Sequence, residues 1–291
     1  MTEITKTRAF EGNSEAIEAW NGVLFDKFSR FRYLIVDGLA HFGTHALARH
    51  RPEAGSRVLD IGCGFGDMTR ELAEVVGSRG EAVGVDAAAR FIEAAKSEAL
   101  HIQQAQFLVR DVEVDDLGGP YQGAFSRFGT MFFTSPVAAF RNVRRSLLPG
   151  AKLVMTVWRH KEDNPWVRVA EVAVEKLVTL PATTDEATCG PGPFSMANAN
   201  LLSSQLLAGG FGEVTLERFD APVLLGRTLA EAVECGMAVG PAGEVLRLAG
   251  SSAEALKPEV AEALSRAFTP YITKEGVYLG GSAWVVSAIA G

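Results

Sequence analysis

Val58-Leu59-Asp60-Ile61-Gly62-Cys63-Gly64-Phe65-Gly66-Asp67-Met68-Thr69 is the stretch of sequence that decides the fold. Its apolar start predicts a short buried strand, its glycines predict a tight turn, and residues 68–76 have the spacing of an amphipathic helix. Glycine accepts positive φ and lets the backbone approach a ligand, and the helix that follows presents free N–H groups. This strand–turn–helix unit is typical of nucleotide-binding α/β folds.

The spacing of the glycines distinguishes between ligands. A dinucleotide-binding loop has the pattern G-x-G-x-x-G, which after Gly62 and Gly64 would require glycine at position 67. Position 67 is Asp67, which would repel a pyrophosphate, and the glycine comes one residue earlier at Gly66. A ligand with an ammonium group can instead use the carboxylate of Asp60. The loop therefore favours a zwitterionic ligand over a dinucleotide, and a glycine-rich turn without a ligand is the alternative.

The same unit repeats along the chain. Further strands are predicted at 82–85, 106–109, 123–128, 152–158, 214–219 and 277–290. Helices are predicted at 87–99, 136–147, 166–180 and 201–208, and over most of 227–269. Alternating strands and helices indicate a mostly parallel sheet with helices on both faces. The fold class is thus α/β, a Rossmann-like seven-stranded sheet.

The alternation also suggests the organisation of the chain. Residues 1–50 are predicted to form an N-terminal helical cap, of which 1–13 are polar and expected to be loose. Residues 51–158 would be the cofactor-binding core, 159–200 an insertion, and 201–291 the rest of the core with a helical insertion and the final strands. The cap and the 159–200 insertion are expected to close over a small-molecule pocket as a lid.

Two more acids stand at the ends of predicted strands, Asp86 after the second and Asp111 after the third. Asp86 is placed to accept hydrogen bonds from ribose hydroxyls, and Asp111 from an adenine amino group. Each alone is equally well explained as a helix N-cap or loop aspartate. Ligands of open α/β sheets bind at the carboxyl ends of the strands, so together with Asp60 the acids indicate an adenosine-containing ligand.

Several motifs resemble those of class I S-adenosylmethionine-dependent methyltransferases. They are the D-x-G-x-G-x-G run at 60–66, Val85-Asp86, Arg110-Asp111-Val112 and Leu148-Pro149-Gly150. Segments at 20–22, 125–133, 157–159, 164–166 and 190–194 are similar to a broad bacterial group near the ubiquinone/menaquinone-type (methyltransferase type 11/25) enzymes. The chain departs from that group at Ser135-Pro136, where Asp-Pro is usual, and at the apolar helix start 87–89.

The resemblance implies a cofactor and its contacts. S-adenosyl-L-methionine would be bound and S-adenosyl-L-homocysteine released. The implied contacts are Asp60, Gly62, Cys63, Gly64, Gly66, Asp86, Ala87, Asp111, Val112 and Ser126. The loop would hold the methionine part, Asp86 the ribose, and Asp111 with Val112 the adenine.

The sequence indicates substrate and catalytic residues less specifically than it indicates the cofactor contacts. Methyl transfer requires alignment, exclusion of water and, for some nucleophiles, a base. The candidate catalytic residues are His160, which follows the fifth strand, and Arg127, at the mouth of the site. The candidate substrate residues are Trp20, Phe128, Met131, Trp158, Arg159 and Phe194. An aromatic or apolar residue of this set is more often a core residue than a pocket residue, and an arginine as readily has an ordinary surface or ion-pair role.

Composition excludes several classes of function. A net charge of −7 argues against nucleic acid as a partner. Three cysteines are too few for a disulfide framework, and no residue spacing predicts a metal site. No signal peptide or membrane-spanning run is present, so the protein is expected to be cytoplasmic, with no membrane partner, and a monomer or homodimer.

The predicted activity is methyl transfer from S-adenosylmethionine to oxygen, nitrogen or carbon of a small, apolar or aromatic metabolite, for example in secondary metabolism. Nucleic-acid or protein methylation is one alternative. The others are a nicotinamide oxidoreductase, an aminopropyl-transferring or other non-methylating enzyme of the same fold, and a non-catalytic binding module.

Overall fold

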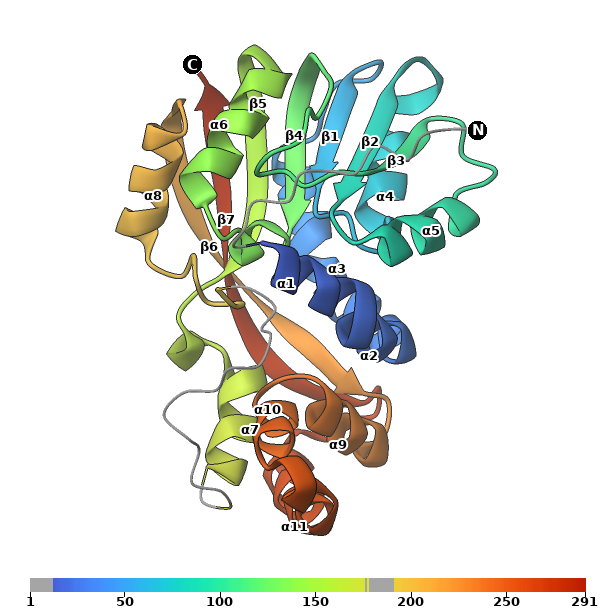
Figure 1. Ribbon diagram of the computed structural model, residues 1–291, viewed down its shortest axis with the longest axis vertical. Helices are drawn as coiled ribbons and strands as arrows, with labels where there is room; N and C mark the ends of the chain where they lie inside the picture. The colour runs from blue at the N-terminus through green and yellow to red at the C-terminus, as the bar shows by residue number, and fades with distance from the viewer. Residues whose placement is uncertain (1–12, 176, 178–190) are drawn as a thin grey trace.

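The fold is known from a computed structural model, which describes residues 13–291 apart from 176 and 178–190. These residues form a seven-stranded sheet of order β3-β2-β1-β4-β5-β7-β6 (Figure 1). The strands are β1 (Arg57–Ile61), β2 (Glu81–Asp86), β3 (Ala105–Val109), β4 (Tyr121–Arg127), β5 (Leu147–Trp158), β6 (Phe211–Gly226) and β7 (Val277–Ala290). The first five are parallel, and β7 runs antiparallel to β5 and β6. The order reverses between β1 and β4, which is where open α/β sheets bind ligands.

Helices cover both faces of this sheet, as predicted. On one face lie α3 (Arg32–Arg49), α4 (Asp67–Val76) and α5 (Ala89–Glu98), whose apolar side chains meet those of Val58, Phe107 and Phe125. On the other face, α6 (Pro136–Ser146) and α8 (Ala199–Ala208) pack against Leu59 and Leu153. The predicted α/β class is confirmed.

A second, helical lobe is attached to the extended ends of β6 and β7 (Figure 1). It consists of α7 (Pro165–Val174), α9 (Leu229–Ala238), α10 (Pro241–Leu248) and α11 (Ala253–Phe268). Val174 of α7 shares one apolar cluster with Leu264 and Phe268 of α11 and with Leu279 of β7. The predicted insertion and the later helical segment therefore form one body. Residues 176 and 178–190, which include the end of the predicted helix 166–180 and Cys189 of the insertion, fall outside the described residues.

The N-terminal helices lie between the carboxyl edge of the sheet and the helical lobe (Figure 1). They are α1 (Ser14–Ala19), a kinked π-helical turn (Trp20–Leu24), α2 (Phe25–Arg30) and α3. Trp20 and Phe25 pack edge-on against Phe91 of α5. Asn13, expected to be loose, is buried instead, because its side chain bonds to the core.

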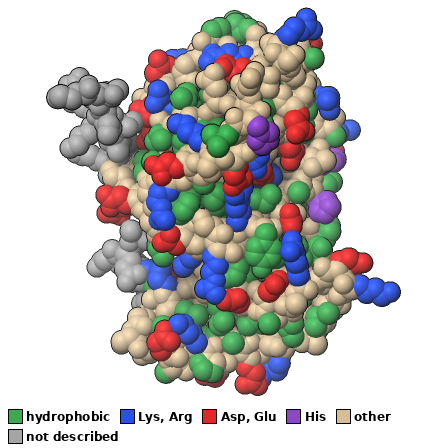
Figure 2. All heavy atoms as spheres, turned by 90° about the vertical axis from the view of Figure 1, so that its right-hand side faces the viewer, with side chains coloured by type: hydrophobic (Ala, Val, Ile, Leu, Met, Phe, Trp, Pro, Cys, Tyr) green, Lys and Arg blue, Asp and Glu red, His purple; other side chains and the backbone are tan. Residues whose placement is uncertain are grey.

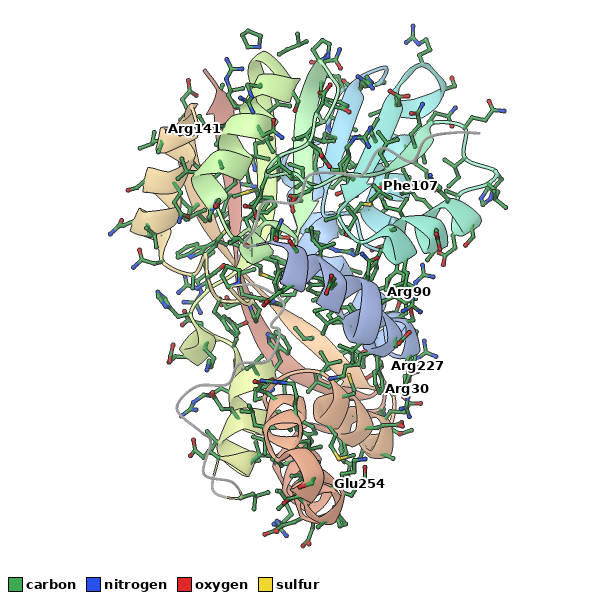
Figure 3. All side chains as sticks on the ribbon, viewed as in Figure 1. Arg30, Arg90, Phe107, Arg141, Arg227 and Glu254 are labelled. Carbon is green, nitrogen blue, oxygen red and sulfur yellow. The ribbon has the colours of Figure 1, made fainter. Side chains whose placement is uncertain are left out.

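Ion pairs connect these helices to both neighbouring parts of the molecule. Asp26 pairs with Arg90 of α5, and Arg30 pairs with Glu234 of α9. Arg227, which follows β6, pairs with Asp37 of α3. Arg30, Arg90 and Arg227 lie along one side of the helices (Figure 3). Figure 2, which faces the right-hand side of the molecule, shows positive and negative side chains interspersed.

Two strands extend far beyond their predicted ranges. β5 begins at Leu147 and not at residue 152, and β6 spans Phe211–Gly226 and not 214–219. The extra residues of β6 pair with β7 from Phe211 opposite Ala290 to Gly226 opposite Val277. Such pairing between distant segments leaves no local signal. Within the described part of the chain, helices are too short or too polar to span a bilayer.

Candidate active site

The glycine loop between β1 and α4 has the backbone that its sequence requires. The φ angles of Gly62, Gly64 and Gly66 are +65°, +53° and +74°, which lie in a region that residues with a Cβ rarely adopt. A Cβ on Gly66 would lie 2.5 Å from the ring of Phe107, whereas on Gly64 the nearest atom, of Phe91, would be 3.9 Å away. Gly66 is thus required for packing, and Gly64 leaves room at the turn.

Asp60 lies beneath this loop at the end of β1. It is 1% exposed, and the Thr69 hydroxyl of α4 donates to its Oδ2 at 2.5 Å. Burial raises the pKa of Asp60 to about 7; the charges of Asp67 and Asp86 act in the same direction, and Arg127 opposes them. Asp60 therefore changes its charge near neutral pH.

Asp86 ends β2 and holds the glycine loop. Its Oδ2 accepts from the N–H of Gly64 at 3.0 Å and its Oδ1 from the N–H of Ala88 at 2.9 Å. Burial raises the pKa of Asp86, and these two hydrogen bonds oppose that rise. Each carboxylate oxygen has a second lone pair, so the group can also accept from a diol. Ala87, the other residue predicted near the ribose, lies between Asp86 and Ala88.

Asp111 follows β3 and receives two hydrogen bonds. Its Oδ1 accepts from the N–H of Glu113 at 2.9 Å, and its Oδ2 accepts from Nδ2 of Asn13 at 2.9 Å. Val112 beside it is buried, and the carboxylate of Glu113 accepts from the N–H groups of Thr134 and Ser135 at the start of α6. Asn13 was missed in the sequence, because an asparagine before a helix predicts only an N-cap.

The end of β4 carries backbone strain and aromatic stacking. Ser126 is buried and donates to the carbonyl of Ile61 at 2.8 Å, which ties β4 to the glycine loop. Phe128 has a φ of +58°, which is unusual for a bulky residue and is found mostly where function requires it. Its ring stacks on Trp158 of β5 at 4.1 Å and meets Phe42 of α3 edge-on at 5.4 Å.

The two arginines predicted near the substrate already hold carboxylates of this chain. Arg127 pairs with Asp67 at the start of α4, and its Cδ would lie 3.0 Å from a Cβ on Gly43 of α3. Arg159 pairs with Asp163 at 3.0 Å, and its guanidinium lies over the ring of Trp284. Both arginines therefore have structural partners.

The other predicted residues are divided between the core and the surface. Met131 is buried and Phe194 is half-buried in the same apolar cluster as Phe128. Trp20 reaches from the cap to Phe132, with 5.0 Å between the ring centroids. His160 is exposed after β5. Among the residues that the structure describes, no cluster of His, Cys, Asp and Glu has the arrangement of a metal site.

The donors and acceptors at this edge fit an S-adenosylmethionine-like ligand. The three predicted acids do meet at the carboxyl ends of β1, β2 and β3, as the parallel register of these strands requires. Asp60 can accept from an ammonium, Asp86 from a diol and Asp111 from an amino group. The facing glycines of the β1 and β4 loops keep the backbones close, since a Cβ on Gly62 would lie 3.0 Å from the Cα of Gly129.

Comparison with known proteins identifies methyltransferases as relatives of this chain. The methyltransferase domain family matches residues 58–150. A 2-phytyl-1,4-naphtoquinone methyltransferase of Thermosynechococcus vestitus is 32% identical over 38% of this chain and 49% of its own length. The aklanonic acid methyltransferase DauC of Streptomyces sp. (strain C5) is 33% identical over 38% of this chain and 61% of its own length. The chain thus spans about half the length of the first of these curated relatives.

Solved structures show the same fold. The YcgJ protein from Bacillus subtilis has a TM-score of 0.54 at 15% identity, over 86% of this chain and 98% of its own. A putative methyltransferase from Bacillus halodurans has a TM-score of 0.53 at 15% identity, over 85% and 98%. Together with the family match over residues 58–150 and the methyltransferase relatives, this shared fold confirms the resemblance drawn from the sequence motifs.

Proposed function

Because residues 58–150 are a methyltransferase domain of the class that uses S-adenosylmethionine, we propose that this chain transfers a methyl group from that cofactor to a small apolar or aromatic metabolite. The observation that carries the proposal is the set of Asp60, Asp86 and Asp111 around a glycine loop at one edge of the sheet. The three acids can serve as acceptors for the hydrogen-bond donors of the cofactor, which are its ammonium, its ribose diol and its adenine amino group.

We assign the methionine part to Asp60 and the loop of Gly62–Gly66, with Cys63 contributing its backbone. Asp86 and Ala87 would hold the ribose, and Asp111 and Val112 the adenine. Ser126 would line the site from β4, where its hydroxyl already fixes the loop through Ile61. These assignments place the sulfur end of the cofactor between the loop and the end of β4.

The cofactor supplies an electrophilic methyl group on a sulfonium, and the protein must align the acceptor and exclude water. The N-terminal helices are suited to exclude water, since Trp20 packs on Phe132 at the end of β4. Where the acceptor carries a proton, His160, which follows β5, is the candidate base. Arg127 is held by Asp67, and we propose that it steadies the start of α4.

For the substrate, we propose a ring compound of the quinone kind. The named relatives act on a phytyl naphthoquinone and on aklanonic acid, and a further relative is a demethylmenaquinone methyltransferase. The aromatic side chains of Phe128 and Trp158, at the ends of β4 and β5, and of Trp166 in α7 suit such a ring. The helical lobe and the N-terminal helices would form the two sides of its pocket.

The test is transfer of a labelled methyl group from S-adenosylmethionine to a panel of reduced naphthoquinones, aromatic acids, oligonucleotides and a protein extract. We expect label in a ring compound, and no label after Asp86→Ala at a cofactor concentration that supports the wild type. Glu254→Gln on the distant α11 is the matched control and should keep full activity. Label only in nucleic acid or protein would contradict the proposed substrate class, and no label in any acceptor would contradict the activity.

A further inference from the structure

Asn13 stands at the N-cap of α1 without capping it. An asparagine at this position ordinarily accepts a hydrogen bond from a backbone N–H of the first turn, which stabilises the helix. In α1 no such side-chain bond is present, although the Asn13 carbonyl accepts from the N–H of Ile17 at 3.0 Å as in any helix start. The Asn13 side chain therefore has another role, and α1 lacks the stabilisation of a side-chain cap.

That use is a contact with the acid predicted to bind adenine. Nδ2 of Asn13 donates to Oδ2 of Asp111 at 2.9 Å across 98 positions of sequence. The two residues are 7% and 5% exposed, and the Thr134 hydroxyl donates to Oδ1 of Asn13 at 3.4 Å. A hydrogen bond to a buried carboxylate is stronger than one between neutral groups. The contact therefore fixes both side chains.

The pair presents a donor next to an acceptor. Nδ2 of Asn13 has two N–H bonds, one of which is used by Asp111, and the described residues provide no partner for the other. The Asp111 carboxylate, with one bond on each oxygen, can accept further bonds. Adenine has the complementary arrangement on its Watson–Crick edge, where the N6 amino donor lies beside the N1 acceptor, and single bases are commonly recognised by hydrogen bonds to this edge.

The rest of the cap keeps Asn13 in place. At the other end of α1, Oδ1 of Asn21 accepts from the N–H of Arg90 at 3.2 Å, and its carbonyl accepts from the Arg90 guanidinium at 3.1 Å. Trp20 packs on Phe132 and Phe91. Figure 3 shows Arg90 reaching from α5 to the N-terminal helices. Contacts at both ends of α1 thus join it to α5 and to the residues that follow β3.

We propose that Asn13 is a cofactor-binding residue, whose amide and the Asp111 carboxylate together recognise the donor–acceptor edge of adenine. This inference rests on the proposed function. It makes the N-terminal cap part of the cofactor site, so that closing the cap and recognising the base are the same event.

The experiment compares two nucleosides by calorimetric titration, S-adenosylhomocysteine and S-inosylhomocysteine, in which hypoxanthine reverses the donor and acceptor of the base edge. The test variant is Asn13→Ser, because serine is an equally good N-cap but is too short to reach Asp111. Glu18→Gln, at an exposed position of α1, is the control. We expect Asn13→Ser to weaken the adenosine ligand about 10-fold and to leave the inosine ligand nearly unchanged, while the control matches the wild type.

The outcomes separate the inference from the proposed function. Equal preference for adenosine in wild type and Asn13→Ser would overturn the inference and leave the function intact. Tighter adenosine binding by Asn13→Ser would also overturn it, since Asn13 would then compete with the cofactor. A wild type that binds neither nucleoside would overturn both. Retained binding of the inosine ligand by Asn13→Ser shows that the variant site is folded.

Discussion

The carboxyl ends of β1 to β3 and those of β4 and β5 are built in different ways. At the first three strands, the carboxylates of Asp86 and Asp111 are oriented by backbone N–H groups of Ala88 and Glu113, two residues further along the chain. At β4 and β5, Phe128 and Trp158 are placed by contacts with Phe42 of α3 and with the helical lobe. Apart from the contact of Asn13 with Asp111, the proposed cofactor half is thus specified locally, whereas the proposed substrate half is specified by the tertiary structure.

This difference suggests how the two halves can vary. A locally specified site persists as long as its short motifs persist, whereas a site assembled from distant helices changes shape when those helices change. A fixed cofactor site beside an adaptable substrate pocket, as proposed, would agree with relatives that are named for different substrates, a phytyl naphthoquinone and aklanonic acid.

The largest expected effect concerns Asp60. Its folded-state pKa of about 7 lies above that of an unfolded aspartate, so the folded state binds the proton more tightly. The free energy of unfolding of the unliganded protein should therefore fall as pH rises from about 4 to 7, because the buried carboxyl must ionise. In Asp60→Asn the amide oxygen still accepts from Thr69 but the amide cannot ionise, so this variant should have a free energy of unfolding at pH 8 that is higher by up to about 4 kcal/mol. Denaturant unfolding at pH 5 and pH 8 measures this.

Cofactor affinity should have the opposite dependence on pH. If the ionised Asp60 holds the ammonium of the cofactor, binding strengthens as pH rises through 7, and Asp60→Asn binds weakly at every pH. Thr69→Val, which removes the hydroxyl bonded to Asp60, should move the midpoint of the binding curve to higher pH. A pH-independent affinity between 5 and 8 in the wild type would show that Asp60 does not bind the ammonium.

The next largest effect is expected at Gly66. Alanine there combines an unfavourable φ of +74° with a Cβ 2.5 Å from Phe107 and 2.9 Å from Ala95. We expect Gly66→Ala to lower the free energy of unfolding by about 3 kcal/mol. Gly212→Ala is the control, because a Cβ there meets no atom within 4 Å and φ is not positive. Equal stabilities of the two variants would contradict the packing role of Gly66.

In the substrate half, Phe128 offers a smaller but more specific test. Both Phe128→Ala and Phe128→Gly remove the stacking on Trp158, but only glycine relieves the φ of +58°. The glycine variant should be the more stable of the two by about 1 kcal/mol, the reverse of the usual order within regular structure. Thermal unfolding of both variants decides this, and a less stable glycine variant would show that the backbone at 128 is unstrained.

The smallest effect is expected from the exposed ion pair between Arg30 and Glu234, which joins α2 to the helical lobe. Arg30→Gln should change the free energy of unfolding by less than about 1 kcal/mol, and less still at high salt. Substrate affinity should respond more than stability does, since the pair connects the two sides of the proposed pocket. Unchanged substrate affinity at low salt would argue that the two sides do not move relative to each other.

Features that depend on local patterns could be predicted from the sequence, whereas features that depend on contacts between distant segments could not. Asp60, Asp86 and Asp111 were placed correctly at the sheet edge, because strand–helix alternation is a local pattern and parallel strands end at a common edge. The full length of β6 was not predicted, since it depends on pairing with β7 more than fifty positions away. Nor was the contact of Asn13 with Asp111, because the local signal of an asparagine before a helix indicates a cap.

Calorimetric titration with S-adenosylhomocysteine measures whether three carboxylates and a glycine loop hold S-adenosylmethionine. We expect saturable binding by the wild type and by Glu254→Gln, and affinity lower by about 10- to 100-fold for Asp86→Ala, which loses a charged acceptor. Absence of binding by the wild type, or equal affinity after Asp86→Ala, would contradict this expectation.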